Sequence, residues 1–248
     1  MMLSFVPLPF LASGGVTYAF QNADFAGKVI IFILLTVSVF TWSVLWTKVN
    51  LIRQAKKENL FFLKRYRNDR SSLDLYTEKK HYPSSPLSFV YQAGARELSF
   101  HLLGSSTVDE TFRARLEDAD KVDSVSMASV RSAMERAVGE QALAMESQLI
   151  LLSTAASGGP FLGLLGTVWG VMEAFSGIAL AGQASLSALA PGVSGALITT
   201  VTGLVVAIPA MFGYNFLITT IRAMIVEMEN FSAECGADFE HRYLKSRS

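Results

Sequence analysis

The sequence has little charge, one cysteine and three histidines. Only 17% of its 248 residues are charged, and the 21 basic and 21 acidic side chains cancel; a soluble domain usually carries about a quarter charged residues. A balanced charge lacks the basic field that nucleic-acid-binding proteins use, so we expect no nucleic-acid partner. The single Cys235 excludes an internal disulfide, and the histidines stand far apart, so we expect neither a metal site nor a cofactor.

What the sequence has instead is long uncharged stretches. They cover residues 29–47, 147–172 and 174–221. As a helix, the first stretch is about 28 Å long and matches a hydrocarbon core of about 30 Å. The last stretch is long enough to hold a turn at residues 177–187 and then a helix that begins near Leu189, with Pro191 in its first turn. We therefore predict an all-α integral membrane protein with three transmembrane helices.

The basic residues predict the orientation of these helices. Seven of the twenty residues from Lys48 to Arg67 are Lys or Arg, whereas Lys28 is the only basic residue before the first span. Cytoplasmic segments next to spans are enriched in Lys and Arg. We therefore expect a periplasmic N-terminus and a cytoplasmic C-terminus.

The predicted organisation has seven parts. They are a periplasmic arm (1–28), transmembrane helix 1 (29–47), a cytoplasmic helical region (48–146), transmembrane helix 2 (147–176), a short periplasmic turn (177–187), transmembrane helix 3 (188–221), and a cytoplasmic C-terminal helix and tail (222–248).

The cytoplasmic region reads as helical. Ser85 followed by Pro86 is typical of a helix start and predicts a helix over residues 86–103. Thr107 and Glu110 have the spacing of a capping box, and we expect a second helix to run from Val108 into transmembrane helix 2. Apolar residues recur along this helix and along residues 221–231 at helical spacing. Spans 2 and 3 are therefore expected to extend into a cytoplasmic bundle, whose apolar stripes pack within one subunit or against another.

Small residues recur along spans 2 and 3. Span 2 carries Gly163, Gly166 and Gly170, and span 3 carries Gly203 within a repeat of small residues every four positions. In lipid, such faces let helix backbones approach closely, so we interpret these glycines as helix-packing residues. Pro209 removes a backbone hydrogen bond and is expected to kink span 3.

Four threonines, Thr167, Thr199, Thr200 and Thr202, lie at depth in these spans. A hydroxyl in a membrane helix bonds its own backbone or lines a polar path, and the sequence leaves both readings open. The three uncharged stretches contain no Asp, Glu, Lys, Arg or His. If the protein conducts an ion, the titrating group must therefore come from another chain.

Two segments resemble the signatures of the TolQ/ExbB/MotA family of inner-membrane proton channels. The segment from Gly163 to Met172 reads GLLGTVWGVM, and the segment from Ala190 to Leu197 reads APGVSGAL. Gly203-Leu and Ala207-Ile-Pro-Ala follow at the distance that the family has, and the order of spans also matches. The approach to span 2 and the segment from Tyr91 to Gly94 look closest to TolQ, with ExbB next.

The resemblance implies a proton-channel motor subunit rather than an enzyme. Family members form a homo-oligomer, a pentamer, around one-span TolR/ExbD-like partners that carry a membrane aspartate. Proton motive force then drives work across the periplasm through a TolA/TonB-like protein, either for envelope maintenance in the Tol-Pal manner or for energised outer-membrane transport. By motif match, Thr167 and Thr200 take the positions of pore-facing threonines, and Thr199 and Thr202 are further candidates for the proton pathway.

One position departs from the family pattern. TolQ-like and ExbB-like members carry a glutamate three residues after the Pro-Gly, where this chain has Gly195. Glu173, near the outer end of span 2, is either an interfacial residue or a vestibule acid. A non-conducting membrane scaffold of the same fold is the alternative function. A transporter or membrane enzyme is disfavoured because the sequence has no internal repeat, charged midplane site or nucleophile with a base.

Overall fold

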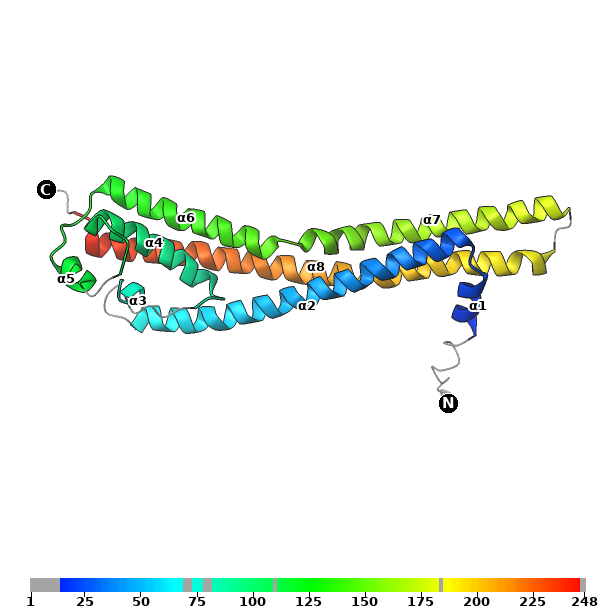
Figure 1. Cartoon of the computed structure of the whole chain (residues 1–248), viewed down its shortest axis with the longest axis horizontal. Helices are drawn as coiled ribbons and strands as arrows, with labels where there is room; N and C mark the ends of the chain where they lie inside the picture. Colours follow the sequence, from blue (N-terminus) through cyan, green and yellow to red (C-terminus); the bar gives the residue numbers. More distant parts are fainter. Residues whose placement is uncertain (1–13, 69–72, 78–81, 109–110, 183–184, 246–248) are drawn as a thin grey trace, which may run out of the picture. The chain divides into compact units, whose positions relative to one another are not determined.

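A computed structural model describes residues 14–68, 73–77, 82–108, 111–182 and 185–245. The regular structure in this part of the chain is helical, as the sequence predicts, with α2, α7 and α8 long and apolar enough to cross a membrane (Figure 1). The helices are α1 (Gly15–Asn22), α2 (Phe25–Asn68), α3 (Asp74–Thr77), α4 (Pro86–Leu103), α5 (Phe112–Glu117), α6 (Ser124–Glu146), α7 (Leu149–Ala181) and α8 (Leu186–Tyr243).

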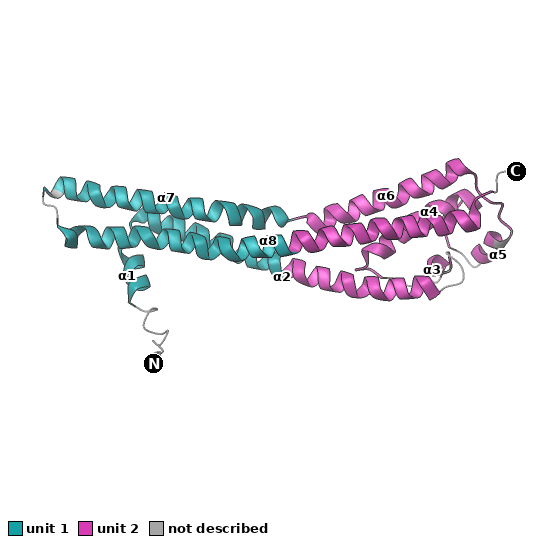
Figure 2. Ribbon diagram, turned by 180° about the vertical axis from the view of Figure 1, so that it is seen from behind, with its two compact units in different colours: residues 1–46, 148–216 teal, residues 47–147, 217–248 magenta. Residues whose placement is uncertain are grey.

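The helices form two compact units (Figure 2). Unit 1 contains α1, α2 as far as Trp46, α7, and α8 as far as Phe216. Its core joins Ile30 and Leu34 of α2 to Val206 of α8, with Leu162 of α7 packed against them. Large apolar side chains on the outside of this unit are exposed, as expected for helices that face lipid; they include Phe32, Trp46, Phe161, Val205 and Phe212.

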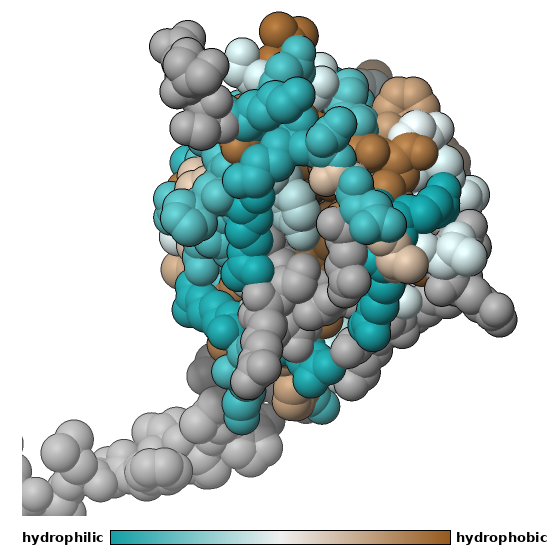
Figure 3. Space-filling view, turned by 90° about the vertical axis from the view of Figure 1, so that its left-hand side faces the viewer, coloured by the Kyte–Doolittle hydropathy of each residue, from teal (hydrophilic) through white to brown (hydrophobic). Residues whose placement is uncertain are grey.

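Unit 2 contains the rest of α2 and α8 together with α3 to α6. An aromatic cluster fills its core around Phe62, whose ring centroid lies 5.7 Å from that of Tyr91 and 5.6 Å from that of Phe231. Helix α4 packs closely on α6 and α8, because Gly94 lies directly against Met134 and Phe239. The face of this unit seen in Figure 3 is mostly hydrophilic, as expected for a surface in water.

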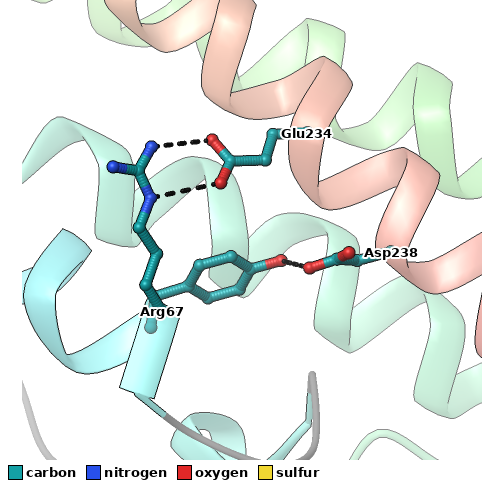
Figure 4. A network of polar contacts seen from close by, with 4 residues as sticks. Arg67, Glu234 and Asp238 are labelled. Carbon is teal, nitrogen blue, oxygen red and sulfur yellow. Dashed lines mark hydrogen bonds and ion pairs between the residues drawn. The ribbon is translucent and has the colours of Figure 1, made fainter.

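Two polar contacts join α2 to α8 within unit 2 (Figure 4). The Arg67 guanidinium donates to both carboxylate oxygens of Glu234 at 3.3 and 3.1 Å. The Tyr66 hydroxyl donates to Asp238 Oδ2 at 2.9 Å. Burial raises the pKa of Tyr66, so the phenol remains a donor at neutral pH. These contacts fix which sides of α2 and α8 meet.

The helix start predicted at Ser85 and Pro86 is confirmed. Ser85 has extended backbone angles, its hydroxyl accepts from Ser88 N at 3.2 Å, and Pro86 begins α4. Helix α4 ends at Leu103 before Gly104, which adopts a left-handed conformation with φ of 69°. Helix α6 begins in the same way, because the Asp123 carboxylate accepts from Ser126 N at 2.8 Å.

The continuous helix predicted from Val108 into span 2 is wrong. The chain forms three separate helices there, and Glu110 of the expected capping box lies outside the described residues. Helix α6 ends at Glu146 because Ser147 turns to an extended conformation and Gln148 takes a positive φ of 68°. The apolar spacing continues through this break, so the sequence pattern did not reveal it.

A lysine side chain from α2 caps the C-terminal end of α6. Lys48 of α2 is only 3% exposed. Its ammonium donates to the carbonyls of Ala144 and Met145 at 3.2 and 3.1 Å, and to Ser147 Oγ at 3.0 Å. A cation at a helix C-terminus satisfies carbonyls that have no partner within the helix and complements the helix dipole. Lys48 therefore holds the end of α6 against α2.

The turn between spans 2 and 3 is shorter than expected. Helix α7 continues to Ala181, Gly182 ends it with a left-handed φ of 66°, and α8 begins at Leu186. Pro191 therefore lies inside α8 rather than in its first turn. Helix α8 also continues through Pro209, and the kink expected there stays a prediction.

We expect the thiol of Cys235 to be unreactive toward thiol reagents in the folded protein. The side chain is fully buried, and burial raises the pKa of its thiol to about 12. The reactive thiolate is then on the order of a thousandfold rarer at neutral pH than for a free cysteine. A maleimide should label Cys235 only after unfolding, whereas Cys introduced at Val125, which is 72% exposed, should react at once. Equal labelling rates in the native protein would contradict this packing.

Candidate functional site

The candidate site lies where α7 and α8 meet through glycines. A Cβ atom added at Gly203 would lie 2.5 Å from the carbonyl oxygen of Gly159, and one added at Gly163 would lie 2.9 Å from that of Thr199. Real Cβ atoms do not approach backbone this closely. The two helices are therefore in backbone contact, which only glycine permits at these positions.

The other two glycines predicted to pack also face α8 of the same chain. A Cβ at Gly166 would meet Thr199 Oγ1 at 2.5 Å, and a Cβ at Gly170 would meet Ala196 Cβ at 2.8 Å. The small-residue face of α7 is thus used inside the subunit, so it is not free to join a second subunit. A bulky residue at Gly166 or Gly170 would first separate α7 from α8.

This close approach brings three hydroxyls together. Thr167 of α7 shares a short hydrogen bond with Thr200 of α8, and its oxygen lies 3.4 Å from Thr199 Oγ1. Thr199 and Thr200 each reach the carbonyl of Gly163 at 3.0 Å. Thr199 also donates to the carbonyl of Ala196 at 2.6 Å. We call Thr167, Thr199 and Thr200 the hydroxyl cluster.

The members of the hydroxyl cluster differ in access. Thr199 is fully buried, whereas Thr167 and Thr200 are half-buried. Each hydroxyl has one proton to donate and two lone pairs that accept. Since the protons go to the carbonyls of Gly163 and Ala196 and to the hydrogen bond between Thr167 and Thr200, what the cluster offers outward is acceptor capacity. It can accept a hydrogen bond from a protonated acid at the accessible side of Thr167 and Thr200.

Thr202 and Glu173 lie apart from the hydroxyl cluster. The Thr202 hydroxyl donates to the carbonyl of Ile198 on its own helix at 2.8 Å. Glu173 is an exposed residue of α7, six residues beyond Thr167. Among the described residues, no group of three or more His, Cys, Asp or Glu side chains is arranged to hold a metal ion.

Gly195, the position where the motif resemblance leads us to expect glutamate, faces the chain's own backbone. A Cβ there would lie 2.7 Å from the N and Cα atoms of Ala23 and from the carbonyl oxygen of Asn22. Ala23 is buried and links α1 to α2. The glycine therefore allows the turn between α1 and α2 to pack on α8. Simply restoring glutamate, as the family pattern suggests, would displace this turn.

The sequence alone did not predict three of the groups that form this site, which are Ala23 and the backbone carbonyls of Gly163 and Ala196. Ala23 carries no functional group, and the carbonyls of Gly163 and Ala196 belong to the backbone. Asp24, which follows Ala23, accepts from Gly27 N at 2.9 Å and caps α2. An Asp just before an apolar helical run is a recognisable N-cap signal, but the contact of Ala23 with Gly195 of α8 depends on the tertiary fold.

We expect a side chain at Gly195 to destabilise the protein. Gly195→Ala places a methyl group against the backbone of Ala23 and should cost about 1–3 kcal/mol. The matched control is Gly177→Ala, because a Cβ at Gly177 meets nothing within 4 Å. Both changes raise helix propensity equally. Thermal unfolding in detergent should show a lower midpoint for Gly195→Ala only, and an unchanged midpoint would contradict this packing.

Comparisons with known proteins agree with the motifs. A model of the MotA/TolQ/ExbB proton channel family matches residues 104–230. The Tol-Pal system protein TolQ of Pseudomonas aeruginosa is 34% identical over 79% of both chains. TolQ of Haemophilus influenzae is 30% identical over 87% of this chain and 89% of that protein. The biopolymer transport protein ExbB of Pseudomonas putida is 31% identical over 90% of this chain and 64% of its own length.

These matches cover α6, α7 and most of α8, which include the glycine contact and the hydroxyl cluster. The resemblance inferred from the two signature segments is thereby confirmed. The chain belongs to the MotA/TolQ/ExbB proton channel family.

Proposed function

We propose that this chain is the channel-lining subunit of an inner-membrane motor of the TolQ–TolR or ExbB–ExbD type. The motor converts proton motive force into mechanical work across the periplasm. That work is envelope maintenance with a TolA-like protein or energised outer-membrane transport with a TonB-like protein. The similarity to Tol-Pal system proteins and to biopolymer transport proteins supports this range of roles.

The observation that carries the proposal is the hydroxyl cluster within long stretches that have no acidic or basic side chain. Residues 29–47, 147–172 and 174–221 contain no Asp, Glu, Lys, Arg or His. A proton that crosses here needs a carrier from another chain, and a one-span TolR/ExbD-like partner with a membrane aspartate supplies one. When that aspartate is protonated, its hydroxyl donates to Thr167 or Thr200. When the proton has passed from the aspartate to water, Thr167 or Thr200 turns its O–H from its present acceptor toward the carboxylate.

The position of the hydroxyl cluster between two helices suits it to this exchange of hydrogen bonds with the aspartate. Thr167 and Thr200 lie on different helices, so the hydroxyl chain crosses the contact between α7 and α8. Thr199 is buried behind them and fixes the carbonyls that take up their protons. The subunit itself is proposed to assemble as a homo-oligomer, a pentamer by the family pattern, around the partner's helix.

A non-conducting scaffold is the second candidate, and one observation favours it. Position 195 lacks the family's carboxylate, and the space beside it is filled by the backbone of Ala23. The two functions differ in one measurable respect. A vesicle that holds the wild-type complex with its one-span partner carries protons down a gradient if the subunit lines a channel, and carries none if it is a scaffold.

We expect Thr167→Val combined with Thr200→Val to abolish proton-driven work in the complex. Valine keeps the shape of threonine, and changing both partners together leaves neither hydroxyl unpaired, so the stability cost should be about 1 kcal/mol or less. Thr202→Val is the matched control, because that hydroxyl bonds only its own helix. Full activity of the double variant, with assembly intact, would contradict the proposed route.

The proposed topology has its own test. Seven basic residues between Lys48 and Arg67 favour a cytoplasmic position for unit 2. A reporter fused after Ser248 or within residues 77–85 should report the cytoplasm, and one within residues 182–187 should report the periplasm. A periplasmic signal from residues 77–85 would overturn this orientation.

A further inference from the structure

The hydroxyl cluster has more protons to donate than carbonyl lone pairs to receive them. Its three threonines each carry one O–H, and the carbonyl oxygens that they reach belong to Gly163 and Ala196. A carbonyl oxygen has two lone pairs. Because both residues lie inside helices, one lone pair on each accepts the N–H of the residue four positions further along. Two lone pairs therefore remain for three hydroxyl protons.

Thr199 takes the free lone pair of Ala196. Its hydroxyl oxygen lies 2.6 Å from the Ala196 carbonyl oxygen and 3.0 Å from that of Gly163. Two other helices hold the side chain in place, because a Cβ at Gly27 of α2 would lie 3.5 Å from its methyl carbon and a Cβ at Gly166 of α7 would lie 2.5 Å from its hydroxyl oxygen. Thr199 is fully buried, so water does not compete for its bond to Ala196.

Thr167 and Thr200 share the free lone pair of Gly163. Thr200 Oγ1 lies 3.0 Å from this carbonyl oxygen, and Thr167 Oγ1 lies 3.2 Å from it. Only one of the two hydroxyls can donate there, and Thr200 is the nearer. Thr167 then donates to Thr200 through the short hydrogen bond that joins them. The O–H of Thr167 is thus left without a carbonyl acceptor.

The Ala196 carbonyl would accept from Thr167 if Thr199 did not occupy it. Thr167 Oγ1 lies only 3.2 Å from the Ala196 carbonyl oxygen. Ala196 is buried, so an O–H that leaves its carbonyl takes away a donor that nothing replaces, which costs free energy. An O–H that leaves Thr200 costs less, because Thr200 is half-buried and its oxygen can still accept from the accessible side. Occupation of Ala196 by Thr199 therefore makes the O–H of Thr167 easier to turn outward.

We propose that Thr199 is a positioning residue of the hydroxyl cluster. By occupying the Ala196 carbonyl, it keeps the O–H of Thr167 available to turn toward the carboxylate on the membrane helix of the one-span partner. Thr167 keeps its proton, and only the direction of its O–H changes. The inference rests on the proposed channel function, and it gives a role in that function to a buried side chain that contacts neither the partner nor the transported proton.

Serine and alanine at position 199 test this role. Thr199→Ser and Thr199→Ala both lose the methyl group beside Gly27, so the two variants differ in the hydroxyl alone. In vesicles that hold the complex with its one-span partner, Thr199→Ser should keep its proton flux. Thr199→Ala should lower the flux about tenfold, because Thr167 must then break a bond to a buried carbonyl. Thr202→Ser and Thr202→Ala are the control pair and should not differ, since the Thr202 hydroxyl bonds its own helix.

Two results would overturn this role of Thr199 while leaving the channel function standing. One is equal flux of the serine and alanine variants. The other comes from thermal unfolding in detergent, where Thr199→Ala should lower the midpoint more in a Thr167→Val background than in the wild-type chain, because Thr167 can no longer take over the Ala196 carbonyl. An equal fall in the two backgrounds would contradict the inference. A wild-type complex that carries no protons would instead overturn the proposed function and this inference with it.

Discussion

The membrane unit depends on one constraint, the backbone contact between α7 and α8. Glycines at 159, 163 and 203 bring the two helices so close that no side chain fits between them. In lipid, where apolar side chains gain little by leaving the solvent, such packing holds helices together. The same closeness lets hydroxyls of α8 reach the Gly163 carbonyl of α7. Packing and the candidate proton site are therefore one structural feature.

Much of this could be predicted from the sequence. Uncharged stretches gave three spanning helices, Ser85 with Pro86 gave the start of α4, and the small-residue repeats gave the sides of α7 and α8 that meet. These features are local or periodic, so they are visible along the chain. The motif around Thr167 and Pro191 added the family, because two separate signatures stand at the family's distance. In each case a few neighbouring residues determine the local structure or the motif, and residues far away in the chain contribute little.

What the sequence could not give depends on contacts between distant residues. Nothing in the local pattern indicates that Gly195 faces Ala23, or that Lys48 ends α6 by capping its carbonyls. The break at Gln148 interrupts no apolar repeat, because Met145, Leu149 and Leu152 are all buried on either side of it. The grouping of Thr199 with Thr167 and Thr200, and its separation from Thr202, follows from which residues face α7. The sequence pattern places all four threonines inside the predicted spans. It does not show which of them face α7.

The central claim is that close packing of α7 and α8 creates the proton site. Gly163→Ala tests it most directly, because the added methyl group would lie 2.9 Å from the Thr199 carbonyl oxygen and from Thr200 Cα, while every hydroxyl is retained. Gly158→Ala, five residues away on the same helix and with nothing within 4 Å, is the control. Proton flux should be measured in vesicles that hold the complex with its one-span partner. We expect flux to be lost in Gly163→Ala and kept in Gly158→Ala; equal flux in the two variants would contradict the account.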